Sequence, residues 1–554
     1  MASIIFIILV PAPSREALVS SSNLFAHSYR YAGLMIKLPF TKSVRVAALP
    51  ALLLLSPALG LVQGCTDLTE SPTSSIAPEN FYRNEEEVIG GLASVYAQLR
   101  QVTECYYFLT ELSSDEIIIP TRGTDWYDNY RFIENDQQAW GANSAAGLND
   151  VNCAWNAMFG GVARANVALA AVDKVSFPSK PVVQAEIRTL RAYYYFLLQD
   201  MFGGVPIVTD TDIKPRERNT RAEVSAFIEK ELKETSAVLP ATWSAEMNGR
   251  MTKGAADAIL ASLYLNAEVF TGTVTTAGLV RGAARWSDAV AACDRILNSG
   301  VYSLASDWRS NFTVANGTSP EIIMAVKFLN EAGLGQHFLQ AALHYSQISS
   351  APWNGWATIA DVYFAFDTDD QRTQIFLAGP QVNLETGAPV NDRSGNRLIF
   401  TPEIVNPKNA TEGEGVRVAK WTLDPNHLVQ ENGNDYPTFR LGEIYLIKAE
   451  ALNELGQTAA AVGLVNTIRA RVFNPTKPVS AGISQADLRT VIMNERLFEL
   501  TVEGKRRQDL IRFGRFTSGT WFNNLQARDP YRILMPIPQT QIETNPLLVQ
   551  NAGY

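Results

Sequence analysis

The sequence is poor in cysteine, in histidine and in surplus positive charge, and each scarcity excludes a class of protein. Its 554 residues include four Cys and four His, too few for a disulfide-stapled scaffold or a His-rich metal protein. The 47 basic residues are outnumbered by 56 acidic ones, which gives a net charge of −9. A nucleic-acid-binding protein normally carries clustered basic surplus, so no nucleic acid is expected as a partner.

Motifs of common catalytic families are absent as well. The chain has no GxSxG, P-loop or HExxH motif. Cys105, Cys153 and Cys293 lack CxxC spacing, and no His stands in a companion motif, so we expect three core thiols and no structural zinc.

A glycoside hydrolase is the rival, catalytic interpretation. It requires two carboxylates facing each other across a cleft, roughly 5–9 Å apart. Glu495, Glu499 and Glu503 occur at helical spacing, but neighbours on one helix line up along a face and do not flank a substrate. We expect them instead to form a charge-paired network with the arginines near them in sequence, which are Arg496, Arg506, Arg507 and Arg512. No catalytic residue is therefore predicted.

A long hydrophobic run occurs only near the N-terminus. Residues 46–62 read VAALPALLLLSPALGLV, interrupted by two prolines and shorter than the ~20 residues that span a bilayer. Three basic residues precede the run, which is the pattern of a secretory signal. It ends at Gly64-Cys65, which resembles a bacterial lipoprotein box, so we expect Cys65 to be lipidated. The alternative is a secreted protein in which Cys65 is incidental.

The position of this signal predicts the domain boundaries. Met35 would begin a signal of normal length, so we expect residues 1–34 to be a gene-start artefact and 35–64 to be the signal peptide. The Ser-, Thr- and Pro-rich residues 65–80 form a lipidated tether. A single folded domain is expected over 81–554.

Beyond the tether, apolar residues recur at helical spacing. This period predicts helices over 155–174, 183–202, 222–238, 252–270 and 285–299. Two further stripes, at 441–455 and 462–472, are separated by Gly456 and closed by Asn474-Pro475, as in a tetratricopeptide-type unit. Between the helical halves, residues 300–437 show little periodicity and predict a loop-rich insertion with short strands. Such irregular segments often carry binding sites.

Several segments, taken in order, resemble one family, the SusD/RagB-like outer-membrane nutrient-binding lipoproteins. They include NEEEVIGGLASVYAQLR (84–100), AEIRTLRAYYYFLLQDMFGGVPIVT (185–209), FRLGEIYLIKAEALNELG (439–456) and LMPIPQTQIETNPLLVQNAGY (534–554). The resemblance implies a mainly α fold with tetratricopeptide-like helix pairs. It also implies a lipoprotein exposed on the outer membrane of a Gram-negative bacterium, partnered with a TonB-dependent (SusC-like) transporter. Its ligand would be an oligosaccharide or, in some members, a peptide.

Two tryptophan-bearing loops are the candidate binding site, because aromatic faces suit the apolar side of sugar rings and planar polar groups suit their hydroxyls. The first, residues 113–140, contributes Arg122, Asp125, Trp126, Tyr127, Asp128 and Trp140. The second, residues 349–366, contributes Trp353, Asn354 and Trp356 around a turn signal. The alternative is that these tryptophans pack in a loop-covered core. A purely protein-binding tetratricopeptide scaffold would not need such loops.

A short acidic run raises the question of a metal. Asp367, Asp369 and Asp370 offer carboxylates of the kind that Ca²⁺ takes. The spacing of an EF-hand is absent and Arg372 is close enough to neutralise them, so a solvated acidic turn is the favoured interpretation. We expect neither a metal nor a cofactor.

Overall fold

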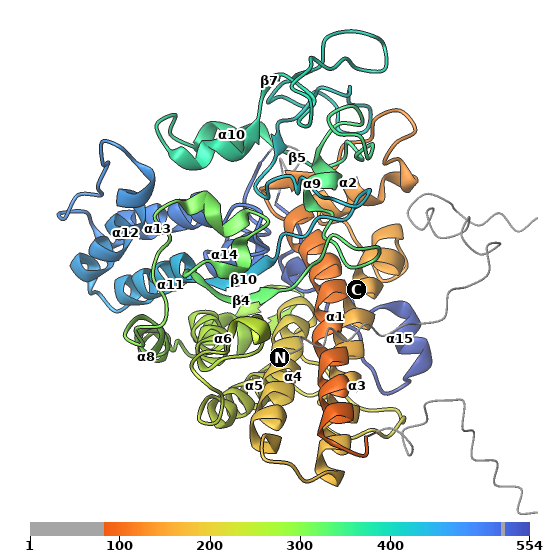
Figure 1. The fold of residues 1–554 in the computed structure, drawn as a ribbon, viewed down its shortest axis with the longest axis vertical. Coiled ribbons are helices and arrows are strands. Elements are labelled where there is room, and N and C mark those ends of the chain that lie inside the picture. The colour runs from red at the N-terminus through yellow and green to blue at the C-terminus, as the bar shows by residue number, and fades with distance from the viewer. Residues whose placement is uncertain (1–81, 522–526) are drawn as a thin grey trace, which may run out of the picture. The chain divides into compact units, whose positions relative to one another are not determined.

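Long α-helices dominate the structure and the strands are few and short, so the mainly α fold predicted from the sequence is confirmed (Figure 1). This computed structural model describes residues 82–521 and 527–554. The longest helices in these ranges are α1 (Glu85–Leu112), α3 (Asn152–Lys174), α4 (Lys180–Phe202), α5 (Arg221–Ser236), α6 (Lys253–Leu265), α8 (Trp286–Leu297), α11 (Leu441–Glu454), α12 (Thr458–Val472) and α13 (Gln485–Leu500). Shorter ones are α2 (Arg131–Asp136), α7 (Ala267–Phe270), α9 (Phe338–Ala342), α10 (Ala360–Ala365), α14 (Arg506–Arg512) and α15 (Gln539–Thr544).

The predictions for the N-terminal segments lie outside the described residues. These are the boundaries of 1–34, 35–64 and 65–80 and the lipidation of Cys65. The described residues belong to one compact unit. None of their helices is both long enough and apolar enough to cross a lipid bilayer.

The helices begin and end at capping signals in the sequence. Asn84 caps α1, because its side chain accepts a hydrogen bond from the backbone N–H of Glu87 at 3.0 Å. Thr220 and Glu223 form a capping box at the start of α5. Gly203, predicted to end α4, has a φ of 74°, a left-handed conformation that glycine adopts at little cost. Local chemistry therefore fixes where these helices begin and end.

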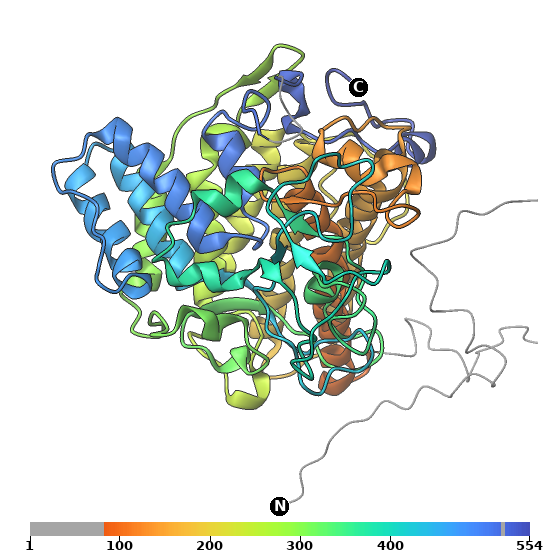
Figure 2. The same cartoon turned by 90° about the horizontal axis from the view of Figure 1, so that it is seen from above.

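Consecutive helices pack on one another and form the tetratricopeptide-like scaffold. Helix α1 packs on α3, α3 on α4, α4 on α5, α5 on α6, and α6 on α8. The array continues from α8 to α11, which packs on both α12 and α13. Figure 2 shows these last helices in blue at one side and the loop-rich segment in green to teal near α1.

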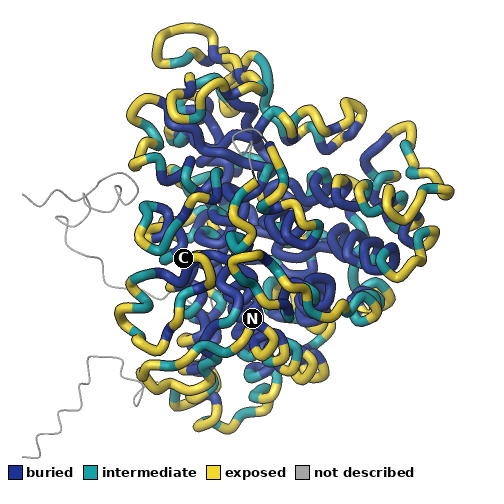
Figure 3. The backbone as a smooth tube through the Cα atoms, turned by 180° about the vertical axis from the view of Figure 1, so that it is seen from behind, coloured by how far each residue is buried: buried dark blue, intermediate teal, exposed yellow. Residues whose placement is uncertain are grey.

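The loop-rich segment predicted at 300–437 contains most of the strands in the described chain. Each strand has one antiparallel partner. The pairs are β1 (Ile117–Ile118) with β5 (Ala357–Thr358), β2 (Thr273–Thr275) with β3 (Gly278–Val280), β4 (Ile322–Val326) with β10 (Tyr436–Arg440), β6 (Phe376–Leu377) with β9 (Arg417–Val418), and β7 (Gly379–Pro380) with β8 (Ile399–Phe400). Figure 3 shows the inner turns of the helices buried and many connecting loops exposed.

A buried ion network joins the loop-rich segment to the C-terminal helices. Arg440, the last residue of β10, pairs with Glu321 at 2.9 Å, with Glu499 at 2.6 Å and with Glu503 at 2.6 Å. Arg372 pairs with Glu499 at 3.0 Å from the other side. All five side chains are at most 1% exposed. The insertion and the C-terminal helices are thus held together by buried ion pairs.

Three glutamates on α13 and in the turn after it form the predicted charge pairs, but with other partners than those expected. Glu495, Glu499 and Glu503 pair with Arg372, Arg440, Arg469, Arg471 and Lys420. The nearby arginines bind elsewhere: Arg496 to Asp509, Arg506 to Asp115, Arg507 to Asp200, and Arg512 to Glu450. The expected partners were wrong because side chains on one helix face meet whichever element packs there, not their neighbours in sequence.

Two cysteines predicted to be core thiols form a disulfide instead. Cys105 of α1 bonds to Cys153 in the first turn of α3, with their Cα atoms 5.8 Å apart. The prediction was wrong because the packing of α1 on α3 brings together residues 48 positions apart in sequence. Cys293 is the buried free thiol that was predicted.

Two buried carboxyl groups make the stability of the fold depend on pH. The backbone N–H of Val502 donates to Glu116 at 2.8 Å, and that of Gly504 donates to Glu111 at 2.6 Å. Burial, and then the charge of Glu111 beside it, raise the pKa of Glu116 well above its usual range. Burial also raises the pKa of Glu111 to about 7. The folded protein therefore retains a proton that the unfolded chain releases near its ordinary carboxyl pKa of about 4.3.

We expect the free energy of unfolding to fall as pH rises from about 5 to about 8, by up to ~1.4 kcal/mol per pH unit for one retained proton. The sign follows because folding raises both pKa values. Their contribution is complete below the pKa of the unfolded carboxyls and is lost as pH rises through the folded values. Glu116→Gln stays neutral at every pH, so urea titrations across this range are expected to show a shallower decline. The exposed control Glu543→Gln keeps the wild-type slope, and a wild-type slope in Glu116→Gln would contradict the assignment.

Candidate functional site

The two loops predicted to bind ligand lie side by side. Strand β1 pairs with β5, so that Ile117 lies opposite Thr358. The hydroxyl of Thr358 donates to the backbone carbonyl of Glu116 at 2.8 Å. In Figure 1, β5, α9 and α2 lie together near the end of α1. The pairing creates one surface, which we call the aromatic face, made of Trp126, Tyr127, Tyr130, His337, Tyr345 and Trp353.

Trp126 and Trp353 form the centre of the aromatic face. The indole N–H of Trp126 donates to the backbone carbonyl of Trp353 at 2.8 Å, and their ring centroids are 6.3 Å apart. Trp126 also packs edge-on against Phe132 at 5.1 Å. Both indoles are partly exposed. The contacts hold the rings in place and leave part of each ring for the apolar side of a ligand.

A glycine allows Trp126 to lie against the second loop. A Cβ added to Gly355 would come within 2.5 Å of the Cζ2 atom of Trp126, a distance that forces one of the two to move. Gly355 thus sets the position of the Trp126 ring.

We expect Gly355→Ala to displace the Trp126 ring, because the added methyl group occupies its place. The near-ultraviolet circular dichroism of the protein is expected to change, and overpacking is expected to cost about 1–3 kcal/mol of unfolding free energy. Gly463→Ala on α12 is the matched control, since its added Cβ meets nothing within 4 Å. An unchanged near-ultraviolet spectrum for Gly355→Ala would contradict the described contact.

Backbone strain is concentrated in the loop that carries Trp126. Trp126, Asp128, Asn129 and Tyr130 have φ values of 58°, 27°, 52° and 61°, in the left-handed region that costs roughly 1–2 kcal/mol for residues other than glycine. The strained turn presents Tyr127, which is 46% exposed and whose ring lies 5.0 Å from that of Tyr130. Such strain clusters at functional sites, so the backbone conformation supports this loop as a candidate binding site.

Polar groups border the aromatic face. Asp125 accepts a hydrogen bond from the hydroxyl of Tyr345 at 2.6 Å and forms an ion pair with Arg393. The Arg393 guanidinium lies 4.0 Å from the centre of the Tyr345 ring. Asp128 is exposed and pairs with Arg131 at 2.9 Å. These groups place donors and acceptors for hydroxyl groups at the edge of the tryptophan pair.

His337 extends the aromatic face beyond Trp353. Its ring lies 5.6 Å from that of Trp353, and its two nitrogens are 3.0 Å from Glu104 and 3.4 Å from Glu431. Burial alone would lower the pKa of His337, but the two carboxylates raise it above its ordinary value. His337, Tyr345 and Arg393 could not be predicted from the sequence, because they stand outside the two tryptophan-bearing stretches and only the fold brings them there.

Arg122 and Asn354, predicted to contact ligand, are buried behind the aromatic face. Arg122 donates to the backbone carbonyls of Asn354 at 3.1 Å and Glu414 at 2.8 Å. Asn354 accepts a hydrogen bond from Arg417 at 2.7 Å through its side-chain oxygen. Both residues are at most 3% exposed. Their expected ligand contact is therefore corrected to a role in positioning the loop that bears Trp353.

Trp140 and Trp356 also lie inside the protein. Trp140 is 0% exposed, and its indole N–H donates to the hydroxyl of Tyr554 at 2.8 Å. Trp356 is 7% exposed and stacks on Tyr107 at 5.1 Å. Neither ring has a free face for a ligand, so for these two the alternative of a loop-covered core holds. The proposed site retains Trp126 and Trp353.

The acidic run is neutralised by neighbouring cations. Lys477 contacts Asp367 at 2.7 Å and Asp369 at 2.8 Å, and the buried Asp370 pairs with Arg372 at 2.6 Å. No group of three or more potential metal ligands occurs among the described residues. The run therefore forms two ion-pair clusters, one exposed and one buried.

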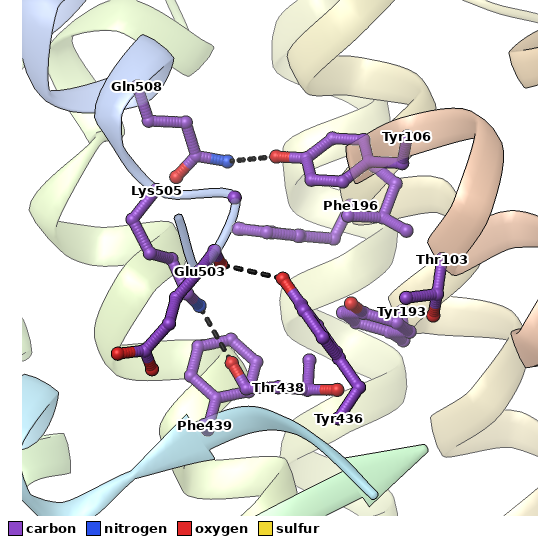
Figure 4. Close-up of a pocket in the computed structure, with 12 residues that line it drawn as sticks. Thr103, Tyr106, Tyr193, Phe196, Tyr436, Thr438, Phe439, Glu503, Lys505 and Gln508 are labelled. Carbon is purple, nitrogen blue, oxygen red and sulfur yellow. Dashed lines mark hydrogen bonds between the residues drawn. The ribbon is translucent and has the colours of Figure 1, made fainter. Parts of the chain in front are cut away.

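A small cavity inside the fold has no room for a sugar. It lies between α1, α4, β10 and the start of α14, and its volume is about 20 Å³. Figure 4 shows its walls, where the Tyr436 hydroxyl donates to the Glu503 carbonyl and Gln508 donates to the Tyr106 hydroxyl. That volume fits about one water molecule, so this cavity is part of the core.

Comparisons with known proteins agree with this architecture. One family model, the SusD family, matches residues 296–554, and another, described as starch-binding associating with outer membrane, matches 84–265. SusD-like protein P25 of Formosa agariphila is 26% identical over 88% of this chain and 96% of its own. The starch-binding protein SusD of Bacteroides thetaiotaomicron is 26% identical over 67% of this chain and 72% of its own.

A solved structure has the same fold. Surface glycan-binding protein A of Bacteroides thetaiotaomicron, in complex with laminarihexaose, superposes with a TM-score of 0.67 at 18% identity. The match covers 84% of this chain and 99% of that one. The helical scaffold and its loop-rich segment therefore form one shared architecture.

Proposed function

The chain belongs to the SusD family, and from this premise we propose that it is a cell-surface lipoprotein that captures oligosaccharides. It delivers them to a partner TonB-dependent, SusC-like transporter in the outer membrane and performs no chemistry on them. The observation that carries the proposal is the aromatic face. There the ring centroids of Trp126 and Trp353 lie 6.3 Å apart, and both rings remain partly exposed.

The aromatic face has the composition that sugar recognition requires. A pyranose ring has an apolar side that stacks on an indole, and hydroxyl groups that need hydrogen-bond partners in fixed positions. Trp126 and Trp353 supply the stacking surface. Asp125, Tyr345 and Arg393 are already held by hydrogen bonds and an ion pair, so little conformational entropy is lost when they bind a ligand.

Capture without catalysis fits the arrangement of the carboxylates. A glycosidase needs one carboxyl held neutral as a general acid and a second one positioned across the bond. At the aromatic face, Asp125 and Glu412 both pair with Arg393, the latter at 3.2 Å. On α13, Glu495 and Glu499 are buried in ion pairs. Each of these carboxylates is therefore already in an ion pair, which does not suit the role of a neutral general acid.

The lipid on Cys65 would hold the protein at the membrane through the tether of residues 65–80. Several acyl chains on one residue give stable anchoring without a transmembrane helix. Tethering raises the effective concentration of loaded binding protein near the transporter. Modest affinity for the sugar then suffices, and it permits release onward.

An array of glycans and peptides, probed with a soluble protein that begins at Thr66, tests this proposal. We expect binding to oligosaccharides, with starch oligosaccharides and laminarihexaose included because relatives are named for such ligands. If only peptides bind, the proposed ligand class would change from oligosaccharides to peptides. Release of reducing sugar from any glycan would overturn the absence of catalysis. Failure to copurify a TonB-dependent transporter with the lipidated protein would overturn the delivery role.

A further inference from the structure

A groove next to the aromatic face is lined mainly by charged and polar side chains. It runs along α1 from Ala97 to Glu104 and is closed by Phe328 and by the turn from Gly333 to His337. Its volume is about 400 Å³, within the usual range of small-molecule sites. Buried Gln98 forms part of the groove and is fixed by a hydrogen bond to the carbonyl of Ala157 at 3.0 Å.

Two guanidinium groups face this groove without an ion-pair partner among the described residues. Arg100 of α1 is half-buried and donates to the carbonyl of Lys327 at 3.3 Å. Burial lowers the pKa of its guanidinium, the direction expected where no carboxylate balances the charge. Arg164 of α3 is exposed and lines the same groove. A guanidinium presents paired N–H donors that match carboxylate and sulfate oxygens.

The carboxylates near the groove are engaged with other groups. Glu431 accepts hydrogen bonds from the backbone N–H groups of Gly333 at 3.0 Å and Gly335 at 2.7 Å. Glu104 contacts His337 at 3.0 Å. Glu431 and Glu104 therefore stabilise the turn and His337. Arg100 and Arg164 remain available to bind an anionic ligand.

The groove is continuous with the sugar-stacking surface. His337 lines the groove and its ring lies 5.6 Å from Trp353. A sugar chain that stacks on Trp353 and continues past His337 would enter the groove that Arg100 also lines.

From this geometry we infer that the groove binds the anionic group, a carboxylate or a sulfate ester, of an acidic sugar unit. The inference rests on the proposed function for the identity of the chain that carries this unit. It names the substrate class more closely: an oligosaccharide whose neutral ring stacks on Trp126 and Trp353 and whose neighbouring unit carries a negative charge bound by Arg100 and Arg164.

Ligand-observed NMR titrations with glucose, glucuronate and glucose 6-sulfate test the groove without knowledge of the full ligand. The three probes share one ring and differ in charge at C6. We expect one or both anionic probes to bind at least tenfold more tightly than glucose, with the preference falling as salt is raised. Arg100→Gln and Arg164→Gln are each expected to weaken anion binding about tenfold. Arg100→Lys, which keeps the charge and loses the paired donors, gives a smaller loss.

Arg489→Gln is the matched control, because Arg489 of α13 pairs with Glu454 and does not line the groove. We expect this variant to bind the anions as the wild type does. Exposed Arg164 tolerates substitution, so Arg164→Gln remains informative even if Arg100→Gln fails to fold. Equal binding of all three probes, or anion binding unchanged in Arg164→Gln, would overturn the inference. Neutral glycans that bind through Trp353 would still support the proposed function in that case. If the anionic probes bind but no glycan binds on the array, the anion site in the groove would be supported and the proposed function would be contradicted.

Discussion

Replacing Arg440 with methionine is expected to lower the free energy of unfolding by about 3–5 kcal/mol. The guanidinium is 0% exposed and contacts Glu321, Glu499 and Glu503 at once. Methionine fills a similar volume but leaves these carboxylates with less positive charge in a region from which water is excluded. Burial would then raise the pKa of the carboxyls, whereas Arg471, Arg440 and Arg372 now hold the pKa of Glu499 well below its usual range.

Urea denaturation of the soluble protein measures this loss. Arg489→Met is the matched control, because Arg489 pairs with Glu454 at 2.6 Å on the surface, where its side chain is 43% exposed. Surface pairs contribute about 0–1 kcal/mol. A change for Arg440→Met no larger than the control's would contradict the view that the buried network holds the insertion to the C-terminal helices.

Trp353→Ala is expected to weaken oligosaccharide binding by about tenfold to a hundredfold. Its ring contacts both Trp126 and His337, so truncation removes the middle of the stacking surface. Central aromatic anchors typically cost 2 kcal/mol or more when cut to alanine, and each 1.4 kcal/mol is tenfold in affinity. Isothermal titration calorimetry with a glycan identified on the array measures the change.

Trp243→Ala provides the control for this substitution. Trp243 is also partly exposed, but it contacts Arg250 and donates to the carbonyl of Met251, on a different segment. We expect it to bind glycan as the wild type does. Affinity retained in Trp353→Ala, or lost equally in Trp243→Ala, would contradict the placement of the site.

The helices were predictable because their signals are local. A stripe over 183–202 and the following Gly203 were enough to predict α4, which spans Lys180–Phe202. Likewise, Gly456 separates α11 from α12 as the pattern indicated. Periodicity and capping report on residues a few positions apart, and helices are built from such neighbours.

The contents of the site were predictable only in part, because exposure depends on contacts between distant segments. Trp126 and Trp140 stand in the same loop, and nothing local distinguishes them. Trp140 is covered because the C-terminal Tyr554 reaches its indole N–H. Trp126 stays partly exposed, and its ring packs closely against Gly355 of the second loop. The partners of Glu499 and the Cys105 disulfide depended in the same way on packing between elements far apart in sequence.

The central claim is that an oligosaccharide binds on the aromatic face and is not altered there. A crystal structure of the soluble protein with a glycan found on the array tests it most directly. We expect an intact sugar chain with one ring stacked on Trp126 or Trp353, and with hydroxyl groups hydrogen-bonded to Asp125, Tyr345 or Arg393. A sugar bound elsewhere on the protein, or one cleaved in the crystal, would contradict it.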